Sequence, residues 1–190
     1  MKDIILFDLD GTLTDPGEGI TNSVAYALAR YGITVEDKST LNCFIGPPLA
    51  ESFAKYYHLS DEDSKRAVDI YREYFAVKGI FENRLYDGIS EMLKTLKKAG
   101  KTLLLATSKP EVYAKQILDH FDLLQFFTFV GGSELDHRRV DKHEVIEYVL
   151  SSLQGVDRER CVMVGDRLHD VIGKFRLCCQ GLPDKTYPMF

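Results

Sequence analysis

Four short apolar runs, separated by long segments with helical periodicity, constrain the fold of this chain more than any other feature. The runs span residues 3–7, 102–106, 126–130 and 161–164. Each run is rich in branched or aromatic side chains and apolar on both faces, which is typical of strands in a parallel sheet covered on both sides. The helical segments between the later runs complete βαβ units. The sequence therefore predicts an α/β fold built on a doubly wound, Rossmann-like parallel sheet.

The segment between the first and second runs is too long for a single crossover. Apolar residues recur at helical spacing from Ile20 to Tyr31, and Gly32 follows as a stop signal. Further helical patterns fill the rest of the segment. We therefore expect an inserted all-helical cap over residues 16–81, and an α/β core made of residues 1–15 and 82–190.

Charge and apolar patterning exclude several classes of partner. The chain carries 24 lysines and arginines against 29 aspartates and glutamates, a net charge of −5, and has no basic run, which argues against nucleic acid. No apolar run approaches the roughly 18 residues of a membrane span, and no secretory leader is visible. The four cysteines are scattered or adjacent, without the spacing of a metal site. We expect a cytoplasmic protein with reduced thiols and no membrane partner.

Acidic and phosphate-binding residue types gather where the predicted strands end. Asp8-Leu9-Asp10-Gly11-Thr12 follows the first run, Thr107-Ser108-Lys109 the second, and Gly165-Asp166 the fourth, with Asp170 four residues later. Ligands of open α/β sheets bind at these carboxyl ends. Crowded carboxylates oppose one another's ionisation unless a cation neutralises them, and a hard cation such as Mg²⁺ suits oxygen ligands. Aspartates after a strand are also common in turns and caps, but the combination favours a phosphoryl-transfer site.

This pattern resembles the haloacid dehalogenase-like superfamily, and within it the phosphoglycolate phosphatase-like hydrolases with a small helical cap. The resemblance extends over residues 1 to about 173. It rests on Lys142 and on four segments of sequence, namely FDLDGTLTDP at residues 7–16, FIGPPL at 44–49, LLLATSKP at 103–110 and MVGDRLHD at 163–170.

The resemblance implies a role for each acidic residue. Asp8 would be the nucleophile that forms an aspartyl-phosphate, and Asp10 would protonate the leaving oxygen and later activate water. Asp166 would bind Mg²⁺ together with Asp8 and the backbone carbonyl of Asp10. Asp170 would orient the metal-bound water or Lys142, although it could instead be only the N-cap of a helix.

The resemblance also implies the groups that hold the phosphate. Thr107, the backbone amide of Ser108 and the Lys142 ammonium would bind or neutralise the phosphoryl oxygens, and Thr12 would fix the turn after Asp10. Thr107 could instead merely cap the turn after its strand. Arg138 or Arg139, only a few residues away in the sequence, could do the work assigned to Lys142, or all three side chains could be solvated.

These residues predict a Mg²⁺-dependent phosphatase, a phosphoric monoester hydrolase, acting on a small phosphorylated metabolite such as phosphoglycolate or a nucleoside monophosphate. A phosphomutase of the same superfamily is the alternative enzyme. A catalytically impaired phosphate- or metal-binding protein is the alternative outside enzymes, because the chain departs from the family after Gly173 and lacks the expected last strand and helix. The run at residues 161–164 would then be an exposed sheet edge, through which we expect self-association.

Overall fold

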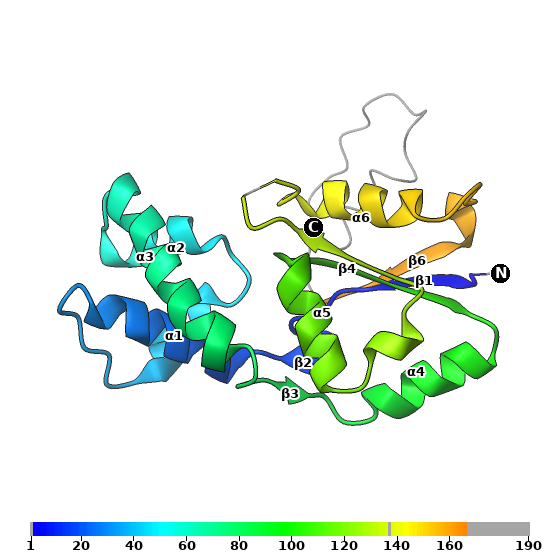
Figure 1. Cartoon of the computed structure of the whole chain (residues 1–190), viewed down its shortest axis with the longest axis horizontal. Coiled ribbons are helices and arrows are strands. Elements are labelled where there is room, and N and C mark those ends of the chain that lie inside the picture. Colours follow the sequence, from blue (N-terminus) through cyan, green and yellow to red (C-terminus); the bar gives the residue numbers. More distant parts are fainter. Residues whose placement is uncertain (1, 137, 167–190) are drawn as a thin grey trace, which may run out of the picture.

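The computed structural model describes residues 2–136 and 138–166, and these form a parallel sheet flanked by helices (Figure 1). The sheet has the order β5-β4-β1-β6, and all of its neighbouring strands run parallel. Its strands are β1 (Ile4–Phe7), β4 (Thr102–Pro110), β5 (Phe129–Ser133) and β6 (Cys161–Val164). The predicted α/β class is therefore confirmed.

Helices cover both faces of this sheet. In Figure 1, α6 (Lys142–Ser151) lies on one face, while α4 (Ile89–Lys98) and α5 (Glu111–His120) lie on the other. Strand residues alternate between the two layers: Leu6 and Leu104 are buried in the cluster that contains α6, whereas Phe7 is buried in the cluster that contains α5. Burial on both faces explains why the strands are apolar throughout.

The helices between β1 and α4 pack against one another beside the sheet rather than on it (Figure 1). We call these helices the cap. They are α1 (Gly17–Ala29), the 3₁₀-helix η1 (Lys38–Phe44), α2 (Leu49–Tyr57), α3 (Asp61–Tyr74) and the π-helical turn η2 (Phe75–Gly79). The position of the core–cap boundary at residues 15/16 and 81/82 stays a prediction.

A two-stranded antiparallel ribbon, which the sequence did not reveal, joins the cap to the core. It consists of β2 (Thr14–Asp15) and β3 (Arg84–Leu85). An ion pair of 2.8 Å between Asp15 and Arg84 ties its two strands together. Strands of two residues are too short to show a hydrophobic period, so sequence patterns cannot find them.

The third strand differs from its predicted position. Residues 124–126 form a 3₁₀-helix, η3 (Leu124–Phe126), and β5 starts only at Phe129 and continues to Ser133. It therefore contains two glycines that the apolar pattern excluded. A Cβ atom on Gly132 would lie 2.4 Å from the carbonyl oxygen of Lys109, so β5 passes the end of β4 too closely for any other residue.

Strand β6, preceded by the 3₁₀-helix η4 (Arg158–Arg160), stands at one edge of the sheet as far as the described residues go. Asp170 and the segment after Gly173 lie outside the described residues. Self-association through this edge therefore stays a prediction, which light scattering can test. Among the helices that the structure describes, none combines the length and apolar character needed to cross a bilayer.

Candidate active site

A tight turn after β1 places the first two candidate carboxylates. The carbonyl of Leu9 accepts hydrogen bonds from the backbone N–H groups of Leu13 (2.9 Å) and Thr14 (3.1 Å), and the N–H of Gly11 donates to the Thr14 carbonyl at 2.8 Å. Leu9 and Leu13 are completely buried and anchor the turn in the core. The turn therefore presents Asp8 and Asp10 from a fixed backbone.

Asp8 lies at the carboxyl end of β1 and forms a buried ion pair with Lys142. Its backbone N–H donates to the carbonyl of Val164 on β6 at 2.9 Å. The Lys142 ammonium is 2.8 Å from Asp8 Oδ1, and the two side chains are 6% and 9% exposed. Buried charges are stable only when they are paired, so each of these groups holds the other in place.

The first residue of α6 brings this lysine to the site. Asp141 caps the helix by accepting a hydrogen bond from the N–H of His143 at 2.7 Å. The helix therefore begins at Lys142. Asp141 followed by Glu144 is a capping-box pattern, which is the sequence signal for a helix start at this point.

Asp10 is paired with a second lysine, Lys109, to which the sequence analysis assigned no role. The ammonium of Lys109 is 3.0 Å from Asp10 Oδ1, and the Lys109 side chain is only 7% exposed. A bulge in β4 aims it there. The register passes from Ala106 opposite Gly131 to Pro110 opposite Ser133, which leaves residues 107–109 as the bulged segment. Bulges commonly redirect side chains beside active sites.

Asp166 follows β6 and lies against the turn at Gly11, and β6 pairs with β1, the strand that Asp8 follows. A Cβ atom on Gly11, whose φ is +80°, would lie 2.4 Å from Asp166 Oδ2. Within the described part of the chain, no three acidic, histidine or cysteine side chains converge on a metal site by themselves. Two carboxylates and a backbone carbonyl, with water and substrate oxygens added, nevertheless fit the usual Mg²⁺ site. Asp170 lies outside the described residues.

The candidate phosphate-binding residues of β4 lie at the same sheet edge. Thr107 is 2% exposed, and its hydroxyl oxygen accepts a hydrogen bond from the N–H of Lys109 at 3.2 Å, as expected of a residue that also shapes the turn. Ser108 is exposed, and its carbonyl accepts from the hydroxyl of Ser133 at 2.8 Å. In the turn after β1, the backbone N–H of Thr12 donates to Leu9, and its buried hydroxyl makes no hydrogen bond among the described residues. Thr12 therefore contributes to this turn through its backbone N–H.

The pKa values of two tyrosines near the site are raised, in part by the negative charge of the carboxylates. Burial, followed by the charge of Asp10, raises the pKa of Tyr71 on α3 well above its usual value. Burial also raises the pKa of Tyr86, with smaller contributions from Asp15 and Asp166. The cap and the linker after β3 therefore both bring side chains close to the acidic cluster.

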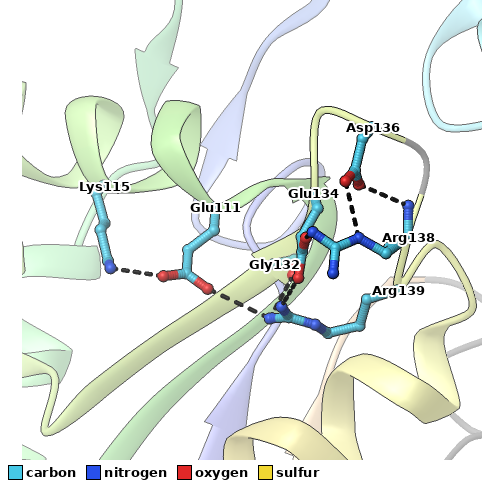
Figure 2. Close-up of polar contacts among 7 residues, drawn as sticks. All are labelled: Glu111, Lys115, Gly132, Glu134, Asp136, Arg138 and Arg139. Carbon is cyan, nitrogen blue, oxygen red and sulfur yellow. Dashed lines mark hydrogen bonds and ion pairs between the residues drawn. The ribbon is translucent and has the colours of Figure 1, made fainter.

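Arg138 and Arg139, the alternatives to Lys142, are engaged in the loop before α6 (Figure 2). Arg138 pairs with Asp136 and Glu134. Arg139 pairs with Glu134, donates to the Gly132 carbonyl at 3.2 Å and lies 3.5 Å from Glu111 of α5. Its guanidinium also stacks on a ring of α6, 3.5 Å from the Tyr148 centroid. These contacts favour Lys142 as the partner of Asp8.

Arg139→Ala is expected to lower the free energy of unfolding by about 1–3 kcal/mol, because it leaves partly buried acceptors without their charged donor. The matched control is Arg138→Ala. The Arg138 side chain is 72% exposed against 18% for Arg139, and we expect its loss to change the free energy of unfolding far less. Urea denaturation of the three proteins measures both values. Equal losses would show that Arg139 does not anchor the loop.

Comparison with known proteins agrees with this arrangement. Residues 5–175 match the family described as haloacid dehalogenase-like hydrolase. A 5'-nucleotidase of Pseudomonas aeruginosa is 49% identical over 180 residues, which cover 94% of this chain and 81% of that protein. Proteins named phosphoglycolate phosphatase also match, at 27–29% identity.

Two further matches are a solved structure and a protein named as a kinase. The crystal structure of a predicted phosphatase from Clostridium acetobutylicum has a TM-score of 0.84 and 50% identity, and the match covers 91% of this chain and 80% of that one. The tyrosine-protein kinase PtkA of Mycobacterium tuberculosis is 39% identical over 170 residues, 90% of this chain but only 57% of the kinase.

Proposed function

Because the chain belongs to the haloacid dehalogenase-like hydrolase family and is one of its phosphatases, we propose that it hydrolyses small phosphate esters with Mg²⁺ through a phosphorylated Asp8. One observation carries this proposal. Asp8 and Asp10, two residues apart, are held by separate buried lysines, at 2.8 Å by Lys142 and at 3.0 Å by Lys109. Two carboxylates in separate environments can take two roles.

In the first half of the reaction, a carboxylate oxygen of Asp8 attacks phosphorus. The new bond joins Asp8 to phosphorus, and the bond from phosphorus to the leaving oxygen breaks. Asp10 donates a proton to that oxygen as the alcohol departs. The Lys142 ammonium, next to Asp8, offsets the negative charge that the phosphoryl group brings to the nucleophile.

In the second half of the reaction, Asp10 acts as the general base and Asp8 is the leaving group. Asp10, now ionised, removes a proton from a water molecule while the water oxygen attacks phosphorus. The bond between Asp8 and phosphorus breaks, inorganic phosphate leaves, and both aspartates return to their starting states. Bringing water in line with the phosphoryl group is mainly a matter of position, which the fixed turn after β1 provides.

Asp8, Asp166 and the backbone carbonyl of Asp10 are the groups that would hold Mg²⁺. When bound, the ion supplies positive charge to the phosphate oxygens and to the crowded carboxylates. Asp166 can lie at the turn because Gly11 has no side chain. With Asp10 carrying the proton that it donates, the described site sets two carboxylates against two ammonium groups, so a dianionic phosphate still needs further positive charge.

We propose a nucleoside monophosphate as the preferred substrate, which the 49% identity to a 5'-nucleotidase supports. Phosphoglycolate is the second candidate. The cap motif at residues 44–49 does not decide between them. Phe44, one of its residues, is 1% exposed and packs against Phe53, with ring centroids 5.0 Å apart, so it belongs to the cap core.

The test is a panel of nucleoside monophosphates, phosphoglycolate, sugar phosphates and p-nitrophenyl phosphate, assayed for phosphate release with Mg²⁺ and with EDTA. We expect EDTA to remove activity, Mg²⁺ to restore it, and Ca²⁺ to substitute poorly because it adopts looser, higher coordination. Full activity after exhaustive chelation would exclude the metal. Isomerisation of a sugar phosphate without phosphate release would favour a mutase, and binding without turnover would favour an impaired binding protein.

A further inference from the structure

The buried ammonium of Lys109 lies between the catalytic turn and the cap. On one side it is 3.0 Å from Asp10 Oδ1. On the other side it is 5.0 Å from the ring centroid of Phe75, the first residue of the π-helical turn η2. One side chain on β4 therefore contacts both the proposed acid–base residue and the cap.

Among the described residues, two contacts compensate the buried charge of Lys109. Within the described residues, no hydrogen bond of standard geometry reaches its Nζ atom, which is buried, so the Asp10 ion pair and the Phe75 ring are its compensation. Moving an ammonium group out of water is costly unless an anion or an aromatic face replaces the water. The position of Lys109 thus depends on Asp10 and on Phe75 together.

Phe75 is itself fixed by rings from both parts of the molecule. It stacks on Tyr71 of α3, with centroids 5.3 Å apart, and meets the edge of Tyr113 of α5 at 5.4 Å. A second contact joins the same parts, because Arg72 of α3 donates to the Leu135 carbonyl at 3.3 Å. The Phe75 ring therefore reaches Lys109 only when the cap is packed on the core.

We propose that Lys109 is a positioning residue that fixes the Asp10 carboxylate for proton transfer and makes that position depend on cap docking. The proposal rests on the proposed function, in which Asp10 donates the proton to the leaving oxygen. The Asp10 side chain is 22% exposed and extends from a turn, so packing in the core does not by itself fix its orientation. The contact of the Lys109 ammonium with Oδ1 restricts its rotation and leaves Oδ2 as the oxygen that carries the transferred proton, and the Phe75 ring restricts Lys109. A docked cap thereby orders the acid.

The proposal predicts an effect that depends on the leaving group. A nucleoside is a poor leaving group and needs its oxygen protonated, whereas p-nitrophenolate departs with little help. For Lys109→Met we expect kcat/KM for a nucleoside monophosphate to fall about 100- to 1,000-fold, and kcat/KM for p-nitrophenyl phosphate to fall less than about 10-fold. The parameter kcat/KM is chosen because it excludes the later hydrolysis of phosphorylated Asp8, which both esters share.

Further variants test whether the effect comes from the charge of Lys109 and from its contact with Phe75. Lys109→Arg keeps the positive charge and should recover part of the loss for the nucleoside monophosphate. Phe75→Leu should shift the ratio of the two kcat/KM values in the same direction as Lys109→Met, but less. The matched control is Lys98→Met on the exposed end of α4, which should leave both values unchanged.

A measurement other than turnover distinguishes failure of the positioning role from failure of the proposed function. Beryllium fluoride with Mg²⁺ mimics phosphorylated Asp8, so it should raise the melting temperature of the wild type and of Lys109→Met alike. Equal losses of kcat/KM for both esters, or no loss for either, in a variant that keeps this response would overturn the positioning role. If the wild type neither hydrolyses any ester nor responds to beryllium fluoride, the proposed function itself fails.

Discussion

Replacing Asp8 by asparagine is expected to reduce phosphate release by about 10⁴-fold or more, because a neutral amide cannot attack phosphorus. The amide keeps an oxygen where Asp8 Oδ1 now lies, 2.8 Å from the Lys142 ammonium, so the fold should survive. Steady-state phosphate release measures the first effect and thermal melting the second. A folded Asp8→Asn protein with activity near that of the wild type would rule out the nucleophilic role.

Lys142→Met is the informative companion of this variant, because it removes a counter-charge that lies 2.8 Å from the buried Asp8 carboxylate. Removing one partner of a buried ion pair costs about 3–5 kcal/mol when the other charge stays behind. Asp8→Asn also leaves one buried charge, that of Lys142, but the amide oxygen can still accept a hydrogen bond from the ammonium. Lys142→Met removes the charge and the donor together, so it should be the less stable of the two single variants, and the double variant should regain part of the lost stability. A double-variant cycle by urea denaturation gives the coupling energy directly.

The sheet and the positions of most site residues could be predicted from the sequence because both follow from local rules. Apolar runs of strand length indicated a parallel sheet, and its topology sends every strand's carboxyl end to one edge. Asp8 and Asp166 follow β1 and β6, which pair with Phe7 opposite Val164, so the two carboxylates had to end up as neighbours.

What the sequence could not reveal depends on contacts between distant segments. The direction of the Lys109 side chain is set by a bulge whose register involves β5, and the bulge in turn requires the close approach that Gly132 permits. The contact of Phe75 with Lys109 depends on how the cap docks. The spacing of residues within one segment cannot predict a contact between distant segments. The sequence therefore shows Lys109 but does not predict that it lies beside Asp10.

Gly11→Ala is expected to raise the Mg²⁺ concentration needed for half-maximal activity about 10- to 100-fold. The new methyl group would lie 2.4 Å from Asp166 Oδ2, closer than van der Waals contact allows. The carboxylate is the flexible partner in this clash, so it moves rather than the backbone. Asp166 is therefore displaced from its position against the turn, and the change should weaken mainly the proposed metal site.

Gly88→Ala isolates the backbone contribution to this effect. Gly88 also has a φ of +80°, but a Cβ atom there would meet nothing within 4 Å. Both variants place an alanine in the left-handed region, so each should lose about 1–2 kcal/mol of stability. Only Gly11→Ala should change the Mg²⁺ requirement, which titration of activity with Mg²⁺ measures. If the two variants need the same Mg²⁺ concentration, then the position of Asp166 beside Gly11 does not matter for metal binding.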